Sequence, residues 1–295
     1  MANWRKALLR LDGAYSDHTL RSYRSDFEAF AAWCRKRRLV ALPCSPRTVV
    51  AYIDAEGGRL KQSSIKRRLC GVRKIHQLCD APDPTLDTDV ELAMRRVRRS
   101  QPGRPRQAFG ITAAIRDQML VACSEDLIGL RDKVLVSVGF DTLCRRGELV
   151  ALSIEDFTPT DDGRYTVLVR RAKNDPEGAG RTCRLSLATS GLVLEWLAAI
   201  GTARGPLLRP VYGKRALGLY LDPLTVGRVL KKLCLRLVTE KVAAEEVSGH
   251  SLRVGAAQQL TINGLGILQI MRAGGWRSMS VVARYVENVD LDVWG

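Results

Sequence analysis

The residues best suited to chemistry lie near the C-terminal end of the sequence. His250 and Arg253 are three positions apart, and Trp276 and Tyr285 follow on later segments. Residues three apart on a helix share one face, so we expect His250 and Arg253 to point in the same direction. Cations and N–H donors that converge on one point bind an anion, and a phenol supplies a nucleophile. This set predicts phosphoryl transfer onto tyrosine.

A second candidate group is Arg145 with Glu148, inside the segment Thr142–Leu149. Apolar residues from Leu149 onward can anchor this segment in a core and leave the two charged residues on a neighbouring face. Taken alone, such a pair is an ordinary surface ion pair that contributes little. The pair supports a catalytic site only if it lies next to the C-terminal group in the folded chain.

Composition favours a polyanionic partner. The 295 residues include 47 Lys and Arg against 31 Asp and Glu, a formal net charge of +16. A surplus of this size, gathered in clusters, is typical of proteins that bind nucleic acid. The hydrophobic content of 46% is sufficient for one large domain or two ordinary ones.

Several classes of protein are disfavoured. No apolar run is long enough to span a membrane, and the first residues lack the apolar core of a signal peptide, so we expect a cytoplasmic protein without membrane contact. The eight cysteines form no C-x-x-C pair and no zinc-ligand spacing, so we expect buried thiols. With three histidines in the chain, we expect no metal site.

The pattern of apolar residues predicts a mainly α-helical protein of two domains with a small β-hairpin. Residues 1–100 form a helical bundle and 101–107 a basic linker rich in Pro and Gly, followed by a second domain over 108–295. Helices of the first domain are predicted at about 17–38, 45–57, 63–79 and 87–99. In the second domain, β-prone runs at 165–170 and 181–187 flank a turn-rich segment. Further helices are predicted at 188–200, 223–238, 250–263, 266–273 and 278–288.

The third predicted helix carries a basic face beside an apolar one. A solvated charged surface is the usual fate of such a face, but further basic clusters at 35–38, 59–61 and 95–99 favour contact with DNA phosphates. The linker is also basic and suits a path along a phosphate backbone. The predicted DNA-binding residues are Lys61, Lys66, Arg67, Arg68, Arg73, Lys74, Arg104 and Arg106.

Together, the segments Thr142–Leu149, Gly249–Ala257 and Gly274–Tyr285 resemble the tyrosine recombinase (phage integrase) family. The resemblance extends over nearly the whole chain. It is greatest to the Cre-like branch, which carries Trp where most relatives have a second His, as at Trp276. The resemblance implies a core-binding domain and a catalytic domain that form a C-clamp around DNA.

The resemblance also implies a role for each site residue. Arg145 and Arg253 would clamp the scissile phosphate, and planar guanidinium forks suit its non-bridging oxygens. Tyr285 would be the nucleophile. His250 would accept its proton, and Trp276 would donate its indole N–H to the phosphate. Lys173, in the hairpin, would be the general acid for the leaving 5′ oxygen, and Glu148 would hold Arg145 or His250 in place.

Each of these residues also has a plain structural interpretation. Tyr285 could be a packed helix tyrosine, Trp276 a core tryptophan and Lys173 a solvated turn lysine. The family resemblance favours the catalytic interpretation, because the residues occur together and in order.

The implied function is site-specific DNA recombination through a 3′-phosphotyrosine intermediate, with no cofactor, ATP or metal. The expected partners are double-stranded DNA with inverted-repeat sites and three further copies of the chain, as a homotetramer on two sites. One alternative is a type IB topoisomerase-like enzyme that relaxes DNA. Another is a DNA-binding regulator without catalysis, which would have no need for a phenol beside two arginine forks.

Overall fold

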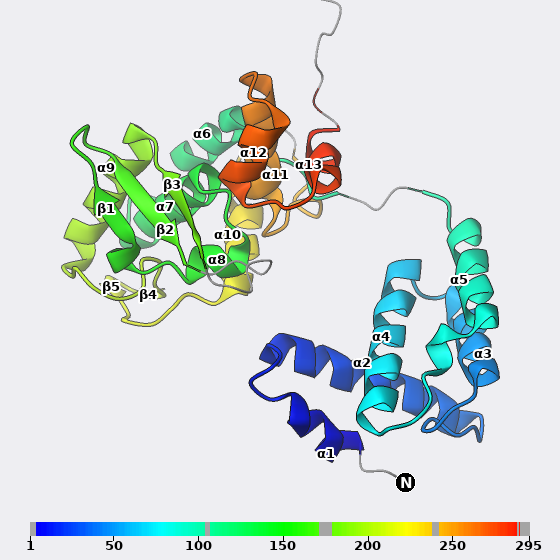
Figure 1. Ribbon diagram of the computed structural model, residues 1–295. Coiled ribbons are helices and arrows are strands. Elements are labelled where there is room, and N and C mark those ends of the chain that lie inside the picture. Colours follow the sequence, from blue (N-terminus) through cyan, green and yellow to red (C-terminus); the bar gives the residue numbers. More distant parts are fainter. Residues whose placement is uncertain (1–3, 104–106, 171–178, 238–241, 288, 290–295) are drawn as a thin grey trace, which may run out of the picture. The chain divides into compact units, whose positions relative to one another are not determined.

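The computed structural model describes residues 4–103, 107–170, 179–237, 242–287 and 289. The chain divides into two compact units, Met1–Pro105 and Arg106–Gly295 (Figure 1). Each unit has its own apolar core. The predicted residues Arg104, Arg106 and Lys173 lie outside the described residues.

The first unit is a helical bundle in its described part. Its elements are α1 (Trp4–Leu8), η1 (Leu9–Leu11), α2 (Asp17–Lys36), α3 (Pro46–Gly57), α4 (Gln62–Leu78), η2 (Pro84–Leu86) and α5 (Thr88–Ser100). Side chains of Ser16, Ser45 and Asp87 accept backbone N–H groups at the starts of α2, α3 and α5, which satisfies donors that have no partner within the helix. Phe27, Phe30 and other apolar residues fill the core.

The four helices predicted for this unit are confirmed, with one shifted start. The third was expected to begin at Ser63 and Ser64, but α4 begins at Gln62 after Lys61. The backbone N–H of Ser64 donates to the Lys61 carbonyl at 2.9 Å, so Ser64 already lies in the first turn. The short α1 was not predicted, because five residues give too little periodicity to recognise.

The second unit combines helices with a small antiparallel sheet. Its first part comprises α6 (Ala113–Val121), α7 (Leu127–Asp141), α8 (Arg146–Val150), η3 (Ile154–Asp156), β1 (Phe157–Pro159), β2 (Tyr165–Val169), β3 (Arg181–Arg184) and α9 (Leu187–Ile200). The rest comprises β4 (Val211–Tyr212), β5 (Arg215–Ala216), α10 (Pro223–Cys234), α11 (Ser251–Ile262), α12 (Ile267–Gly274) and α13 (Met279–Val286).

The predicted hairpin is confirmed as β2 and β3, which pair antiparallel with Val167 opposite Cys183. The sheet has a third strand, β1, which pairs with β2 and was not predicted. Strands β4 and β5 also were not predicted. These strands have two or three residues each, too few to show the alternation that identifies a strand.

Helix α7 is the central helix of this unit and brings the parts of the site together. Its residues from Val134 to Phe140 are all buried. A Cβ on Gly139 would lie 2.7 Å from Cδ1 of Leu252 and 3.0 Å from Cδ2 of Leu149. Glycine therefore allows α7, α8 and α11 to approach closely, which places the residues after α7 beside those at the start of α11.

No helix in the described part of the chain is long and apolar enough to cross a membrane.

Candidate active site

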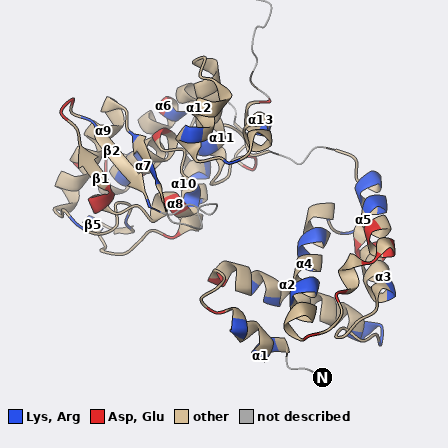
Figure 2. Cartoon of the chain, in the orientation of Figure 1, with Lys and Arg blue, Asp and Glu red and all other residues tan. Residues whose placement is uncertain are grey.

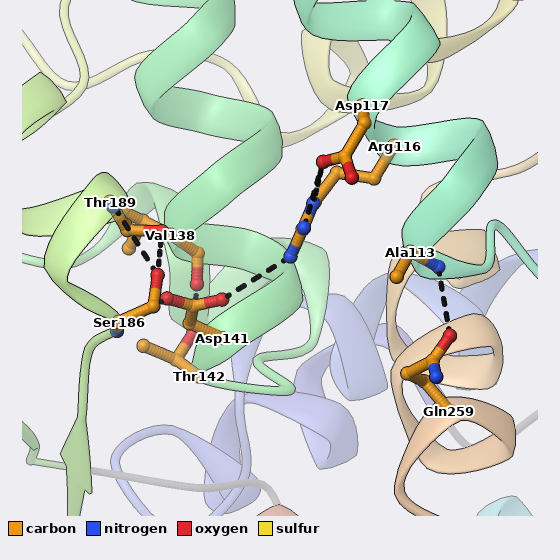
Figure 3. A network of polar contacts seen from close by, with 9 residues as sticks. All are labelled: Ala113, Arg116, Asp117, Val138, Asp141, Thr142, Ser186, Thr189 and Gln259. Atoms are coloured by element: carbon orange, nitrogen blue, oxygen red, sulfur yellow. Dashed lines mark hydrogen bonds and ion pairs between the residues drawn. The ribbon is translucent and has the colours of Figure 1, made fainter. Parts of the chain in front are cut away.

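The turn after α7 is the backbone segment that leads into the site. Leu143 has φ of +51°, in the left-handed region, and is buried. Figure 3 shows how the end of α7 is held: the Thr142 hydroxyl donates to the Val138 carbonyl at 2.6 Å, and Asp141 accepts the backbone N–H of Ser186 at 2.8 Å. Arg116, from α6, lies 3.9 Å from Asp141. These contacts fix the turn that leads to Arg145.

Arg145 stands at the N-cap of α8 and is paired with Glu148. The carboxylate of Glu148 accepts the backbone N–H of Arg145 at 3.0 Å and its Nη1 at 2.6 Å. Glu148 is buried, whereas the side chain of Arg145 remains 19% exposed. The ion pair is therefore not a solvated surface pair. The buried carboxylate holds the guanidinium in one orientation while leaving it accessible to a ligand.

Arg253 is a buried cation whose hydrogen bonding is incomplete. It is 1% exposed, and its Nη1 donates to the carbonyl of Leu143. Its Nη2 is also buried and has no hydrogen-bond partner among the described residues. Burial, followed by the charge of Arg145, lowers the pKa of Arg253 to about 10. A negatively charged ligand would both accept the free N–H and relieve this repulsion.

His250 directly precedes the helix that carries Arg253, whereas the sequence predicted both residues within one helix. It is the N-cap of α11 rather than a residue within the helix, and it is exposed whereas Arg253 is buried. Partial desolvation, then the charges of Arg146, Arg253 and Arg145, lower the pKa of His250 below its ordinary value. The imidazole is thus held neutral near pH 7, the form that can accept a proton.

Trp276 links the arginine to the tyrosine. Cζ of Arg253 lies 4.0 Å from the Trp276 ring centroid. The Trp276 and Tyr285 rings meet edge to face with centroids 5.6 Å apart. Gly274 makes this packing possible, because a Cβ there would lie 2.0 Å from Cζ3 of Trp276. Tyr285, on α13, is half-buried and packs against the core of the unit.

The structure thus brings together Arg145, Glu148, Arg253, Trp276 and Tyr285, with His250 at their edge. Lys173 lies outside the described residues. No cluster of three or more His, Cys, Asp or Glu that could hold a metal ion occurs within the residues the structure describes.

Three residues near this site were missed in the sequence. Arg181, on β3, donates to the carbonyl of Ala273 at 2.8 Å and to the thiols of Cys144 and Cys183. The amides of Gln107 and Gln258 both donate to the backbone carbonyl of Tyr285. The sequence carried no signal for them, because their partners are backbone carbonyls and thiols from distant segments.

The predicted DNA-binding residues of the first unit fall into two groups. Lys61 and Lys66 are exposed. The others make contacts within the unit: Arg67 with Asp26 at 2.6 Å, Arg68 with Tyr52 at 2.8 Å and Glu56 at 3.3 Å, Arg73 with Asp83 at 3.0 Å, and Lys74 with the Tyr15 hydroxyl at 3.3 Å. Arg68 is the most buried of the three arginines, with 23% side-chain exposure.

Lys and Arg residues recur along α4 and at the end of α5 (Figure 2). A groove of about 960 Å³ lies between these helices. Its apolar floor includes Leu69 and Val90, and its basic rim includes Lys66, Arg73 and Arg95.

Comparisons with known proteins point to the same family over both units. The model of the Phage integrase family matches residues 111–291, and that of the Phage integrase N-terminal SAM-like domain matches residues 6–79. An integrase/recombinase xerD homolog from Selenomonas ruminantium is 30% identical over 297 residues, covering 96% of this chain and 85% of that protein. Recombinase cre of Escherichia phage P1 is 28% identical over 296 residues, covering 94% and 86%.

Solved structures share the fold. XerH site-specific recombinase bound to palindromic difH substrate gives a TM-score of 0.67 at 14% identity, over 92% of this chain and 76% of that one. A lambda integrase (75–356) dimer bound to a COC′ core site gives a TM-score of 0.65 at 14% identity, over 99% and 98%. The mainly helical, two-domain fold predicted from the sequence is confirmed.

Proposed function

The chain belongs to the phage integrase family of tyrosine recombinases, enzymes of site-specific DNA recombination, and we propose that Tyr285 is the residue that cuts and rejoins the DNA strand. The observation that carries this assignment is the state of Arg253: a buried guanidinium with a free N–H, close to Arg145 and separated from the Tyr285 ring by one indole. A phosphate diester fits this arrangement because it supplies charge and acceptors together.

In the cleavage step, the phenol oxygen of Tyr285 attacks the scissile phosphorus. A bond forms between that oxygen and phosphorus, and the bond from phosphorus to the 5′ oxygen breaks. The products are a 3′-phosphotyrosine and a 5′ hydroxyl. Arg145 and Arg253 donate to the non-bridging oxygens, where negative charge is stabilised in the transition state.

Two protons must move in this step. A phenol titrates near 10 in water, so Tyr285 must lose its proton as it attacks, and His250 is the proposed acceptor. The lowered pKa of His250 keeps it in the neutral, accepting form. Lys173 is proposed to give a proton to the departing 5′ oxygen.

Rejoining is the reverse reaction with a different strand. A 5′ hydroxyl from a partner duplex attacks the phosphotyrosine and gives its proton to Lys173, and the phenol leaves as it takes its proton back from His250. The free energy of the broken bond is kept in the phosphotyrosine linkage, so the proposed reaction needs no ATP. The two arginines stabilise the charge that a metal ion would otherwise neutralise, so it needs no metal. The proposed partner is double-stranded DNA with inverted-repeat sites, and the proposed assembly is a homotetramer on two such sites.

A suicide substrate tests the assignment. A DNA site is first selected from a random pool by binding to the protein, then nicked so that the cleaved end diffuses away. The expected result on a denaturing gel is a covalent protein–DNA adduct with the wild-type chain and none with Tyr285→Phe. Tyr212→Phe is the matched control, because Tyr212 is 84% exposed on the short strand β4. An adduct with Tyr285→Phe would overturn the assignment.

A further inference from the structure

The segment that enters the second unit is hydrogen-bonded to α11 and to the residues before that helix. The N–H of Phe109 donates to the Glu246 carbonyl at 3.1 Å, and that of Ile111 to the Ser251 carbonyl at 3.0 Å. The N–H of Ala113 donates to the side chain of Gln259 at 3.2 Å, as Figure 3 shows. We name residues 107–113 the strap. It is thereby fixed to the helix that carries Arg253.

Two side-chain amides converge on the main chain of Tyr285. Nε2 of Gln107, at the start of the strap, donates to the Tyr285 carbonyl oxygen at 3.2 Å. Nε2 of Gln258, on α11, donates to the same oxygen, also at 3.2 Å. A carbonyl has two lone pairs and can accept both bonds. Because Tyr285 is next to the last residue of α13, its carbonyl is one of those without a partner inside the helix.

Gln258 is held firmly. It is 9% exposed, and a Cβ on Gly110 would lie 2.0 Å from its Oε1. The glycine in the strap therefore makes room for the Gln258 amide, and the strap and α11 interlock at this point. An amide fixed in this way defines where the Tyr285 carbonyl can lie.

Helix α13 is short, and its apolar anchors are Val282 together with the partly buried Tyr285 and Val286. It spans eight residues, and Val282 is the one that is fully buried among them. Such a short helix is marginal without tertiary contacts. The two bonds to the Tyr285 carbonyl add a directional constraint on the nucleophile's backbone to this apolar packing.

We propose that Gln107 and Gln258 are positioning residues that set the distance between the Tyr285 phenol and the phosphate held by Arg145 and Arg253. This inference rests on the proposed function of Tyr285. In-line attack requires the reacting atoms to lie about 3–3.5 Å apart, and a shift of about 1 Å costs on the order of 100-fold in rate. Since Gln107 also belongs to the predicted linker, the same bond ties the linker to the nucleophile's helix.

The test compares variants that remove the donor with one that keeps it. Gln107→Met and Gln258→Met are similar in length but cannot donate, whereas Gln107→Lys retains a donor. Single-turnover adduct formation is measured on the nicked DNA at saturating protein, together with DNA affinity and thermal unfolding. We expect both Met variants to form adduct roughly 10- to 100-fold more slowly at unchanged DNA affinity. Gln107→Lys is expected to remain within about threefold of wild type.

A substrate with sulfur in place of the bridging 5′ oxygen separates attack from departure of the leaving group. The sulfur leaves without a proton, so this substrate should restore the rate of Lys173→Ala. It should not restore the Met variants, because their defect is in the position of the nucleophile.

Two results would overturn the inference. One is a Met variant that folds normally and forms adduct at the wild-type rate. The other is a loss of rate that is fully explained by the fraction of the variant protein that is unfolded. Gln107 is only half-buried, so Gln107→Met gives a clear answer even if Gln258→Met does not fold. Failure of the proposed function is a separate outcome, recognised by an absent wild-type adduct or an adduct that survives Tyr285→Phe.

Discussion

The guanidinium of Arg253 lies over the indole of Trp276, with Cζ 4.0 Å from the ring centroid. Arg253 is also buried, and one of its N–H donors has no partner in the described chain. Its pKa is lowered to about 10. The indole stabilises the cation from one side through its ring electrons. The remaining donor is left to a ligand.

Replacement of Arg253 by lysine should abolish most activity while retaining a positive charge. Lysine cannot both donate to the Leu143 carbonyl and offer a second, parallel N–H to phosphate. We expect adduct formation to slow by about 100- to 1,000-fold, the loss typical of removing one preorganised donor. The measurement is single-turnover cleavage of the nicked site. A loss of rate below about threefold would show that the planar, two-donor geometry of the guanidinium is unimportant.

The pH dependence of cleavage should follow the neutral form of His250. Because its pKa is lowered in the folded protein, the proton-accepting form persists below the ordinary value of about 6.5. Adduct formation should therefore fall only when the pH drops through this lowered value.

Partial desolvation is the larger cause of this shift, and the charge of Arg146 is next. Arg146→Ala should raise the pKa of His250, so that the acid side of the pH–rate profile moves to higher pH. Lys231→Ala, an exposed change on α10, is the control. An unchanged profile for Arg146→Ala, or an equal shift for Lys231→Ala, would contradict the electrostatic account.

Gly274→Ala should destabilise the second unit and displace Trp276. The added methyl would lie 2.0 Å from the indole ring, and overpacking of this kind costs about 1–3 kcal/mol. Thermal and denaturant unfolding measure the effect. Gly191→Ala is the matched control, since its Cβ would meet nothing within 4 Å on helix α9. That variant should be neutral or more stable by up to about 1 kcal/mol.

In the first unit, Lys66 and Arg68 should behave differently although both were predicted to bind DNA. Lys66→Ala should lower DNA affinity and reduce the slope of its salt dependence by about one, because the exposed lysine is available to phosphate. Arg68→Ala should mainly lower stability, since Arg68 bonds to Tyr52 and the buried Glu56. Affinity at several salt concentrations and unfolding curves separate the two effects. Equal salt slopes for both variants would contradict this division.

Local patterns in the sequence predicted the helices well, because Ser45 and Asp87 mark helix starts and apolar spacing marks the buried faces. The approach of Arg145 and Arg253 could be expected only from the family resemblance. In the structure their approach depends on Gly139 and on the left-handed turn at Leu143. His250 was predicted inside the helix but is its N-cap, one residue before α11 begins.

Contacts between distant segments could not be predicted at all. Gln107 and Gln258 are ordinary polar residues in the sequence, and only the folded chain shows that they share the carbonyl of Tyr285. The same holds for Arg181, whose partners lie on α12 and beside Arg145.

The most direct test of the central claim is to locate the DNA attachment by mass spectrometry. The wild-type adduct on a nicked site is digested with protease and nuclease, and the modified peptide is sequenced. The account predicts a 3′-phosphonucleotide on the phenol oxygen of Tyr285. Attachment to any other residue, or an adduct of the same yield from Tyr285→Phe, would contradict it.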